Sequence, residues 1–171
     1  DVNAAEVQRY VDALCSEISM VSQLPVMGER PFRFVYFGGG TPSFLSPKQL
    51  TKLADRLREH ITWDGAEEVT FECEPGTLTE KKLDAIRGMG VTRLSLGVEN
   101  FDDHILESNG RAHRSGEIDR AYGYARKIGF PQINIDLIAG MMNETEENWE
   151  KCISQAIALG PDMVTIYQME V

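Results

Sequence analysis

The chain has 171 residues, of which 42% are hydrophobic and 26% are charged, as in an ordinary globular domain with its own core. Its formal net charge of −10 argues against a nucleic-acid partner and against an anionic membrane, because both need a basic surface. No run is long and apolar enough to span a membrane, and no signal peptide is visible. The cysteines Cys15, Cys73 and Cys152 have neither metal-ligand nor disulfide spacing, which predicts a reducing, cytoplasmic compartment.

The first half of the chain alternates between helix and strand patterns. Apolar residues at helical spacing predict an amphipathic helix over about residues 4–22, capped by Asn3, and a loop follows over residues 24–30. β-Branched and aromatic residues then predict a strand, and Ser46-Pro47 has the pattern of a helix start. The segments expected after the loop are a strand at Arg33–Phe37, a helix from Ser46, a strand at Glu67–Cys73 and a helix from Thr79 to Gly88–Gly90.

The second half repeats this alternation and indicates the fold class. Its expected strands are Val91–Val98, Gln132–Ile138 and Met163–Tyr167, and its expected helices begin at Asp102, Ser115 and Thr145 and end at Asn109-Gly110, Gly129 and Gly160. Alternating βα units predict an α/β domain with a parallel sheet and right-handed crossovers. Two arrangements remain open, a doubly wound open sheet and a complete or partial barrel, and in both a ligand binds at the carboxyl ends of the strands.

The whole chain, residues 1–171, is expected to be a single domain, because no linker or low-complexity tract divides it. The first predicted element is a helix and the last is a strand. A parallel sheet that begins with an uncovered helix suggests a missing strand before Asp1. We therefore expect the chain to be a piece of a longer protein.

A run of three glycines follows the first predicted strand and precedes Thr41-Pro42. Glycine leaves no Cβ between the main chain and a ligand, and proline stops the strand. The run predicts that a small ligand lies against the bare backbone of Gly39 and Gly40. The alternative is a tight strand-to-helix turn that binds nothing.

Carboxylates lie at or near the ends of the later strands. Glu72 and Asp136 lie inside apolar strands, and Glu99 ends the third strand, while the fifth runs to Gln168, Met169 and Glu170. A buried carboxylate costs several kcal/mol unless a partner compensates it. One alternative is a structural hydrogen bond to the backbone or to an arginine such as Arg93. Their equivalent positions beside the glycine run favour a shared polar ligand that carries an ammonium group and ribose hydroxyls.

Other residues give weaker indications of chemistry. Arg111 follows a short helix and is either a surface residue or a clamp for a ligand carboxylate. His104 and His113 are predicted to be solvated rather than metal ligands, and no metal site is expected in this chain. The sequence contains no Ser–His–Asp set, P-loop or GxGxxG motif, so we assign no catalytic residue.

The motifs taken together resemble a known family. The segments YFGGGTPSFL, VTFECEP, RLSLGVENFDD, NGRAH and INIDLIAGM, in this order, are similar to the radical S-adenosylmethionine enzymes of the oxygen-independent coproporphyrinogen III oxidase type. The resemblance implies a partial parallel (β/α)6 barrel, here without its first strand. It implies S-adenosylmethionine and a [4Fe–4S] cluster as cofactors. One electron, from an electron donor, cleaves the sulfonium to give a 5′-deoxyadenosyl radical that takes a hydrogen from the substrate.

The resemblance also implies roles for particular residues. The segment Gly39, Gly40 and Thr41 matches the part of the family that lies along the methionyl group of S-adenosylmethionine. Glu72 matches an acidic residue that binds the cofactor. Glu99, Arg111 and Asp136 match positions near the cofactor, including a second cofactor molecule in enzymes of the oxidase type.

Two features depart from the family. The cluster-binding CxxxCxxC loop is absent and would end a few residues before Asp1, so this chain alone is not expected to hold the cluster or to have radical activity. Glu99 replaces the glutamine that is usual in the oxidase, which adds a negative charge near the cofactor.

Three functions of the parent protein remain open. The first is oxidative decarboxylation of porphyrinogen propionates in haem biosynthesis, with a tetrapyrrole as the substrate. The second is methyl transfer or cyclopropanation on the same core. The third is haem trafficking without catalysis.

Overall fold

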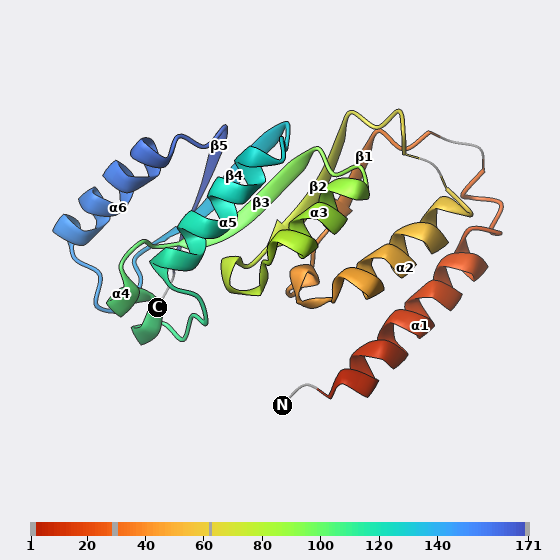
Figure 1. Ribbon diagram of the computed structural model, residues 1–171, viewed down its shortest axis with the longest axis horizontal. Helices are drawn as coiled ribbons and strands as arrows, with labels where there is room; N and C mark the ends of the chain where they lie inside the picture. The colour runs from red at the N-terminus through yellow and green to blue at the C-terminus, as the bar shows by residue number, and fades with distance from the viewer. Residues whose placement is uncertain (1–2, 29–30, 62, 170–171) are drawn as a thin grey trace.

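The computed structural model describes residues 3–28, 31–61 and 63–169, which form one open parallel sheet with helices along one side (Figure 1). The strands are β1 (Phe34–Phe37), β2 (Glu68–Cys73), β3 (Arg93–Glu99), β4 (Gln132–Ala139) and β5 (Met163–Gln168). The helices are α1 (Ala4–Val21), α2 (Pro47–Arg58), α3 (Glu80–Gly88), α4 (Asp103–Ser108), α5 (Ser115–Lys127) and α6 (Glu146–Leu159), with the short 3-10 helices η1 (Pro42–Phe44) and η2 (Pro75–Thr77).

The predicted elements are all present, with bounds that differ by one or two residues. The largest difference is in β3, which begins at Arg93 because Val91 and Thr92 still belong to the turn, where the Thr92 side chain accepts a hydrogen bond from the Val69 amide. Residues 29–30 of the predicted loop and Glu170 after the fifth strand lie outside the described residues.

The five strands pair in sequence order, and every pair is parallel. The helices form a single layer on one face of the sheet, in front of the strands in Figure 1. A doubly wound sheet would carry helices on both faces, so the barrel type of arrangement is confirmed. The barrel is not closed among the described residues.

The helix-covered face of the sheet supplies the core. Alternate residues on β2, β3 and β4 point into it, and the most buried of them include Phe71, Leu94, Leu96, Ile133 and Ile135, each 0% exposed. Helix α1 packs mainly on α2, where Val11, Cys15 and Leu53 form a second, smaller cluster. Burying apolar area at about 25 cal/mol per Å² is the main force that holds the helices to the sheet.

The opposite face of the sheet carries mostly polar side chains, because strand residues alternate between the two faces. Tyr36, Glu72, Ser95, Asp136 and Tyr167 all belong to this face. Gly40 and Thr41, which follow β1, line the same pocket as Tyr167 on β5, so the sheet curves enough to bring its first and last strands near each other. A polar concave face with no helix over it is suited to a polar ligand.

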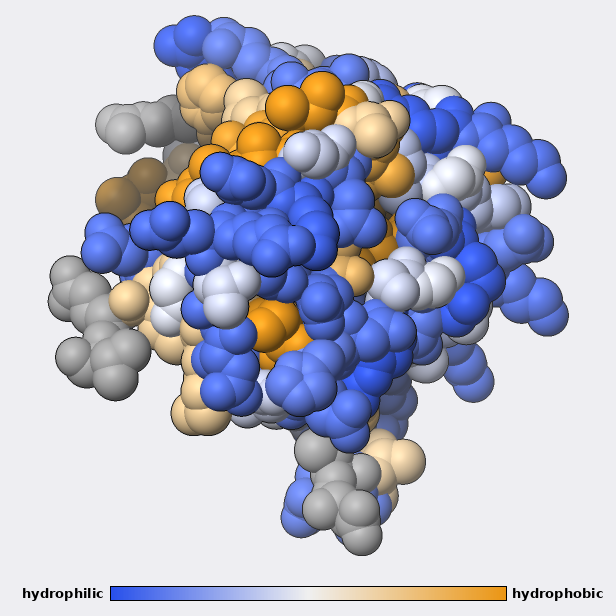
Figure 2. Space-filling view, turned by 90° about the vertical axis from the view of Figure 1, so that its left-hand side faces the viewer, coloured by the Kyte–Doolittle hydropathy of each residue, from blue (hydrophilic) through white to orange (hydrophobic). Residues whose placement is uncertain are grey.

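Strand β5 forms one edge of the sheet and leaves apolar residues in contact with solvent. Val164 is 42% exposed and Ile166 is 53% exposed. Figure 2 looks at the end of the molecule where α6 and β5 lie, and it shows a hydrophobic area among hydrophilic side chains. Within the described residues, no helix is sufficiently long and apolar to cross a membrane.

Candidate functional site

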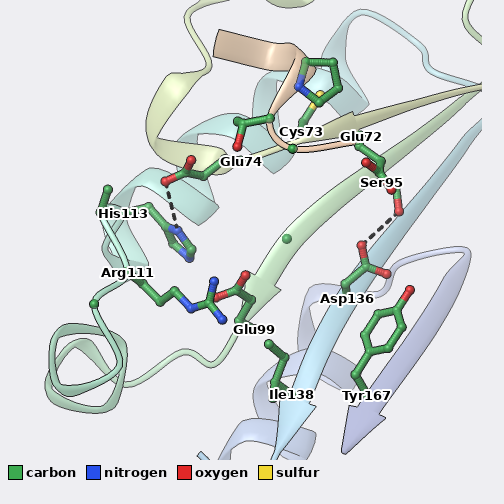
Figure 3. A pocket seen from close by; sticks show the side chains of 16 residues that line it. Glu72, Cys73, Glu74, Ser95, Glu99, Arg111, His113, Asp136, Ile138 and Tyr167 are labelled. Atoms are coloured by element: carbon green, nitrogen blue, oxygen red, sulfur yellow. Dashed lines mark hydrogen bonds and ion pairs between the residues drawn. The ribbon is translucent and has the colours of Figure 1, made fainter. Parts of the chain in front are cut away.

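The carboxyl ends of the strands surround a pocket of about 500 Å³. Six of the seven residues predicted to bind the cofactor line it, namely Gly40, Thr41, Glu72, Glu99, Arg111 and Asp136. Gly39, the seventh, lies beside it and contacts Glu72 through its backbone amide. Figure 3 shows the charged side chains pointing toward one another across the pocket. The structure therefore brings the predicted set together at one edge of the sheet, as parallel strands require.

Glu72 is held by the strand beside it and by the glycine run. Its Oε1 accepts a hydrogen bond of 2.5 Å from the Tyr36 hydroxyl, and its Oε2 accepts one of 3.0 Å from the Gly39 amide. A Cβ on Gly38 would lie 2.3 Å from the Tyr36 ring and 2.8 Å from Glu72, so the pair needs a glycine there. The hydrogen bond to Glu72 is the main cause that raises the pKa of Tyr36 to about 12.

Asp136 belongs to a buried polar network on three strands. Its two oxygens accept hydrogen bonds from the Ser95 hydroxyl at 3.0 Å and from the Asn134 amide at 2.9 Å. Thr165 donates in turn to Asn134 at 3.1 Å. Asp136 is half-buried, and neutral donors hold its carboxylate at the edge of the pocket that it lines (Figure 3).

The alternative that an arginine neutralises these strand carboxylates is wrong for Arg93. Arg93 lies 3.9 Å from Glu68, lower on the same face of the sheet, and not beside Glu72 or Asp136. The backbone part of that alternative is correct for Glu72, because the Gly39 amide donates to it. Hydroxyl and amide groups therefore donate to Glu72 and Asp136, and neither carboxylate is paired with a cation among the described residues.

Glu99 and Arg111 form an ion pair at the far side of the pocket. Arg111 Nε lies 2.6 Å from Glu99 Oε2, and the two side chains are 34% and 17% exposed respectively. Burial raises the pKa of the Glu99 carboxyl more than the nearby Arg111 lowers it. Because the Arg111 guanidinium is already paired with Glu99, a ligand carboxylate would have to compete with Glu99 for the guanidinium.

His113 also lines the pocket, and the prediction that it is solvated is wrong. It is 1% exposed, whereas His104, predicted in the same way, is exposed. A histidine in a polar loop gives no sequence signal of burial, because burial here depends on how η2 and the end of β3 close over it. Tyr167, Ser95 and Glu74 are further pocket groups that the sequence did not single out, although the alternation of β5 and β3 places the first two on the polar face.

The described residues do not suit a metal cluster. No three His, Cys, Asp or Glu side chains in residues 3–28, 31–61 and 63–169 are placed to hold a metal ion. Cys15, Cys73 and Cys152 are buried and free, and burial raises the pKa of the Cys73 and Cys152 thiols, which disfavours the thiolate that an iron ligand requires.

A comparison with known families identifies the superfamily. Residues 19–156 match the Radical SAM superfamily, in which SAM stands for S-adenosylmethionine. The chain belongs to the radical SAM superfamily. This match confirms the resemblance drawn from the motifs and agrees with the parallel strands and the one-sided helical layer of the structure.

Two curated relatives of the chain carry different names. The chain is 32% identical over 98% of its length to "Heme chaperone HemW" of Bacillus subtilis, and covers 44% of that protein. It is also 32% identical over 95% of its length to "Oxygen-independent coproporphyrinogen III oxidase" of Escherichia coli, and covers 35% of that protein. The chain thus spans less than half the length of either relative.

The solved structures place the fold in the same superfamily. Coproporphyrinogen III oxidase (HemN) from Escherichia coli superposes with a TM-score of 0.88, at 30% identity, over 96% of this chain and 38% of that one. The archaeal Elp3 of Methanocaldococcus infernus superposes with a TM-score of 0.68 at 20% identity, which shows a shared fold. The radical SAM fold is therefore common to proteins with different names, and the reaction has to be argued from the site.

The charges of this radical SAM pocket define the ligand that it can take. Glu72, Glu74, Glu99 and Asp136 are carboxylates, and Arg111 is the guanidinium among the lining residues. Carboxylates in a partly enclosed site repel an anion and stabilise a cation, since the local dielectric constant is lower than that of water. The arrangement is suited to a cationic ligand with several hydrogen-bond donors.

Proposed function

We propose that this chain is the S-adenosylmethionine-binding core of a radical SAM enzyme. The observation that carries the proposal is the acidic pocket at the carboxyl ends of β2, β3 and β4, next to the exposed backbone of Gly40 and Thr41. S-Adenosylmethionine has a sulfonium, an ammonium and ribose hydroxyls, which match an excess of carboxylates. Glu72 and Asp136 would hold its cationic and hydroxyl groups, and Arg111, paired with Glu99, would accept its carboxylate only in competition.

The cofactor would supply a carbon radical when a [4Fe–4S] cluster reduces it, which is the chemistry that superfamily membership implies. The described residues contain no ligand set for that cluster, so we derive no step through it. What these residues can do is bind the cofactor, orient it and shield it from water along the polar face of the sheet. An electron donor would be a further partner.

For the parent protein we propose a tetrapyrrole-related activity in the cytoplasm, with coproporphyrinogen III oxidation as the first candidate. The support is the 32% identity to the Escherichia coli oxidase and the TM-score of 0.88 to its structure. Haem trafficking is the second candidate, supported by an equal identity of 32% to the Bacillus subtilis haem chaperone. Methyl transfer has weaker support, because a methyltransferase of the superfamily superposes at 16% identity and so shares the fold alone.

Calorimetric titration of the chain with S-adenosylmethionine tests the core proposal. We expect saturable binding, and weaker binding of S-adenosylhomocysteine, which lacks the sulfonium charge. No binding of either compound to the folded chain would refute the proposal. The folded state is checked in the same samples by circular dichroism.

The natural full-length polypeptide, reconstituted with iron and sulfide under anaerobic conditions, separates the two candidate activities. An oxidase consumes coproporphyrinogen III and gives a product that is lighter by the lost carboxyl groups. A chaperone binds haem and leaves coproporphyrinogen III unchanged. Addition of mass to the substrate would instead support methyl transfer.

A further inference from the structure

His113 lies in the loop between α4 and α5. Its side chain is 1% exposed, and its backbone passes very close to η2. A Cβ on Gly76 would lie 3.2 Å from the His113 Cβ and 3.4 Å from its Cα. A glycine at residue 76 therefore permits the loop to pack the imidazole between η2 and the end of β3.

The imidazole holds the end of β3 through the backbone. His113 Nε2 lies 3.1 Å from the carbonyl oxygen of Val98, and a carbonyl can only accept, so Nε2 carries the hydrogen. The same oxygen accepts a hydrogen bond of 2.8 Å from the Asn100 amide. This contact falls where the pairing of β3 with β4 changes register, between Gly97 and Glu99. The imidazole thus braces a bulge in the strand.

The residue next to that contact is Glu99, which has a φ of 65°. A residue with a side chain in the left-handed region is strained by about 1 kcal/mol or more, and persists only when its surroundings impose it. The loop of His113 acts on this residue at two points, because His113 contacts the carbonyl of the preceding residue, Val98, and Arg111 lies 2.6 Å from the Glu99 carboxylate. One loop therefore constrains both the backbone and the side chain of Glu99.

The other ring nitrogen faces a second strand end. His113 Nδ1 lies 3.9 Å from Glu74 Oε1, at the start of η2, and has no hydrogen-bond partner among the described residues. In Figure 3 the imidazole stands between Glu74 on one side and the Glu99–Arg111 pair on the other. The contact with Val98 is thus the hydrogen bond through which His113 acts on the site.

We propose that His113 is a positioning residue, whose Nε2–H holds the Val98 carbonyl so that Glu99 keeps its left-handed backbone and its carboxylate stays in the pocket. Its effect on ligand binding rests on the proposed function, but its effect on Glu99 does not. Removing the Nε2–H donor would let the bulge relax and the Glu99 carboxylate move toward solvent.

Two amide variants separate the two ring nitrogens. His113→Gln places an amide nitrogen near the position of Nε2 and can still donate to Val98. His113→Asn places its amide near the position of Nδ1 and cannot reach Val98. Both variants replace the imidazole with a neutral amide, so a difference between them reports the position of Glu99 and not a difference in charge.

The direct measurement is the titration of the Glu99 carboxyl by carbon NMR, with Glu99→Gln to assign the signal. Burial raises this pKa, Arg111 and His113 lower it, and Glu74 and Asp136 raise it. We expect His113→Gln to keep the raised value and His113→Asn to bring it down toward that of a solvated glutamate. Equal values in both variants, whether shifted or unshifted, would overturn the proposal.

Binding of S-adenosylmethionine is the second measurement, and we expect about tenfold weaker binding in His113→Asn with near-normal binding in His113→Gln. Absence of binding to the unaltered chain would refute the proposed function, while the Glu99 titration would still decide the role of His113. If His113→Asn does not fold, Gly76→Ala replaces it, because the added Cβ would lie 3.2 Å from the His113 Cβ and push the loop back by a few tenths of an ångström without removing any polar group. An unshifted Glu99 titration in folded Gly76→Ala would then count against the proposal.

Discussion

At the residue scale, two donors hold the Glu72 carboxylate, namely the Tyr36 hydroxyl and the Gly39 amide. The phenol and the backbone amide each donate to one oxygen of the carboxylate, at 2.5 and 3.0 Å. These donors leave the carboxylate without a cationic partner among the described residues, so its charge is available to a cationic ligand. The Gly39 amide is thereby used inside the protein, so the ligand meets the backbone mainly at Gly40 and Thr41.

The first prediction tests the charge of Glu72. Glu72→Gln keeps the shape of the side chain but removes its charge, and it should weaken S-adenosylmethionine binding about tenfold or more, because hydrogen bonds to charged groups contribute about 1.5–3 kcal/mol. Binding is measured by calorimetry, and Glu67→Gln, which alters an exposed carboxylate paired with Arg33, is the matched control. If the Glu72 variant unfolds while the control does not, Glu72 is structural rather than ligand-binding.

The second prediction concerns pH and Glu99. Its folded-state pKa is raised above the ordinary value for a glutamate, mainly by burial, so the folded chain holds this proton more tightly than the unfolded chain. The stability that this tighter proton binding provides is present below the pKa of Glu99 in the unfolded chain. It is lost as pH rises through the pKa of Glu99 in the folded chain. Glu99→Gln removes this loss, so its unfolding free energy relative to the unaltered chain should improve as pH rises above the ordinary pKa of a glutamate.

Urea unfolding at each pH measures this difference, and each tenfold change in proton affinity corresponds to about 1.4 kcal/mol. Asp162→Asn gives the opposite sign, because hydrogen bonds from the Ile133 amide and Arg126 lower the pKa of Asp162. The stability that comes from the lowered pKa of Asp162 is present above the pKa of this group in the unfolded chain and is lost on acidification. A pH-independent difference for Glu99→Gln would contradict the buried position of its carboxylate.

At the scale of elements, a buried polar network joins the loops that follow β1 and β2. Ser43, which is 0% exposed, accepts hydrogen bonds at its hydroxyl from the Glu74 amide and the Thr77 hydroxyl. Its carbonyl accepts one of 2.6 Å from Lys82 on α3, which is 8% exposed. This network fixes η1, and with it the glycine run, to η2 and α3.

The third prediction tests that network. Lys82→Met keeps the length of the side chain but leaves the Ser43 carbonyl without its partner, so unfolding free energy should fall by about 1–3 kcal/mol. The effect is limited because the charged amine is itself costly to bury, as its lowered pKa indicates. Lys81→Met, the exposed neighbour on the same helix, is the control and should change stability little. Equal stability of the two variants would show that the Lys82 contact contributes nothing.

The sequence predicted the elements well and the polar loops poorly, for physical reasons. The strands and helices follow from periodic burial, and the carboxyl-end rule gathers Glu72, Glu99 and Asp136 without knowledge of side-chain positions. The burial of His113 and the pairing of Glu99 with Arg111 depend on a register shift in β3 and on the close approach to Gly76. Neither feature has a periodic pattern, so both require the structure.

At the scale of the whole molecule, one face of the sheet is apolar and packed under helices, and the other is polar and open (Figure 1). This division is visible in the strand sequences, where Asn134 and Asp136 alternate with Ile133, Ile135 and Leu137. It does not by itself tell a barrel from a doubly wound sheet, because that depends on where the helices pack. The carboxylates of the polar face and the net charge of −10 both favour a cationic ligand over an anionic one.

The last prediction concerns the negative electrostatic potential of the pocket and of the chain as a whole. S-Adenosylmethionine carries one more positive charge than S-adenosylhomocysteine, so an acidic pocket in an acidic chain should prefer the sulfonium several-fold at low salt. Salt screens charges over about 10 Å at 0.1 M, so the preference should shrink as salt is added, although the partly enclosed pocket should retain part of it. Calorimetric titration of both compounds at two salt concentrations measures this preference.

Asp136→Asn, which removes one pocket charge, should reduce the preference for the sulfonium more than Asp119→Asn, which alters an exposed carboxylate of α5. A preference that is absent, or equally reduced by both substitutions, would mean that the pocket carboxylates do not select the cation.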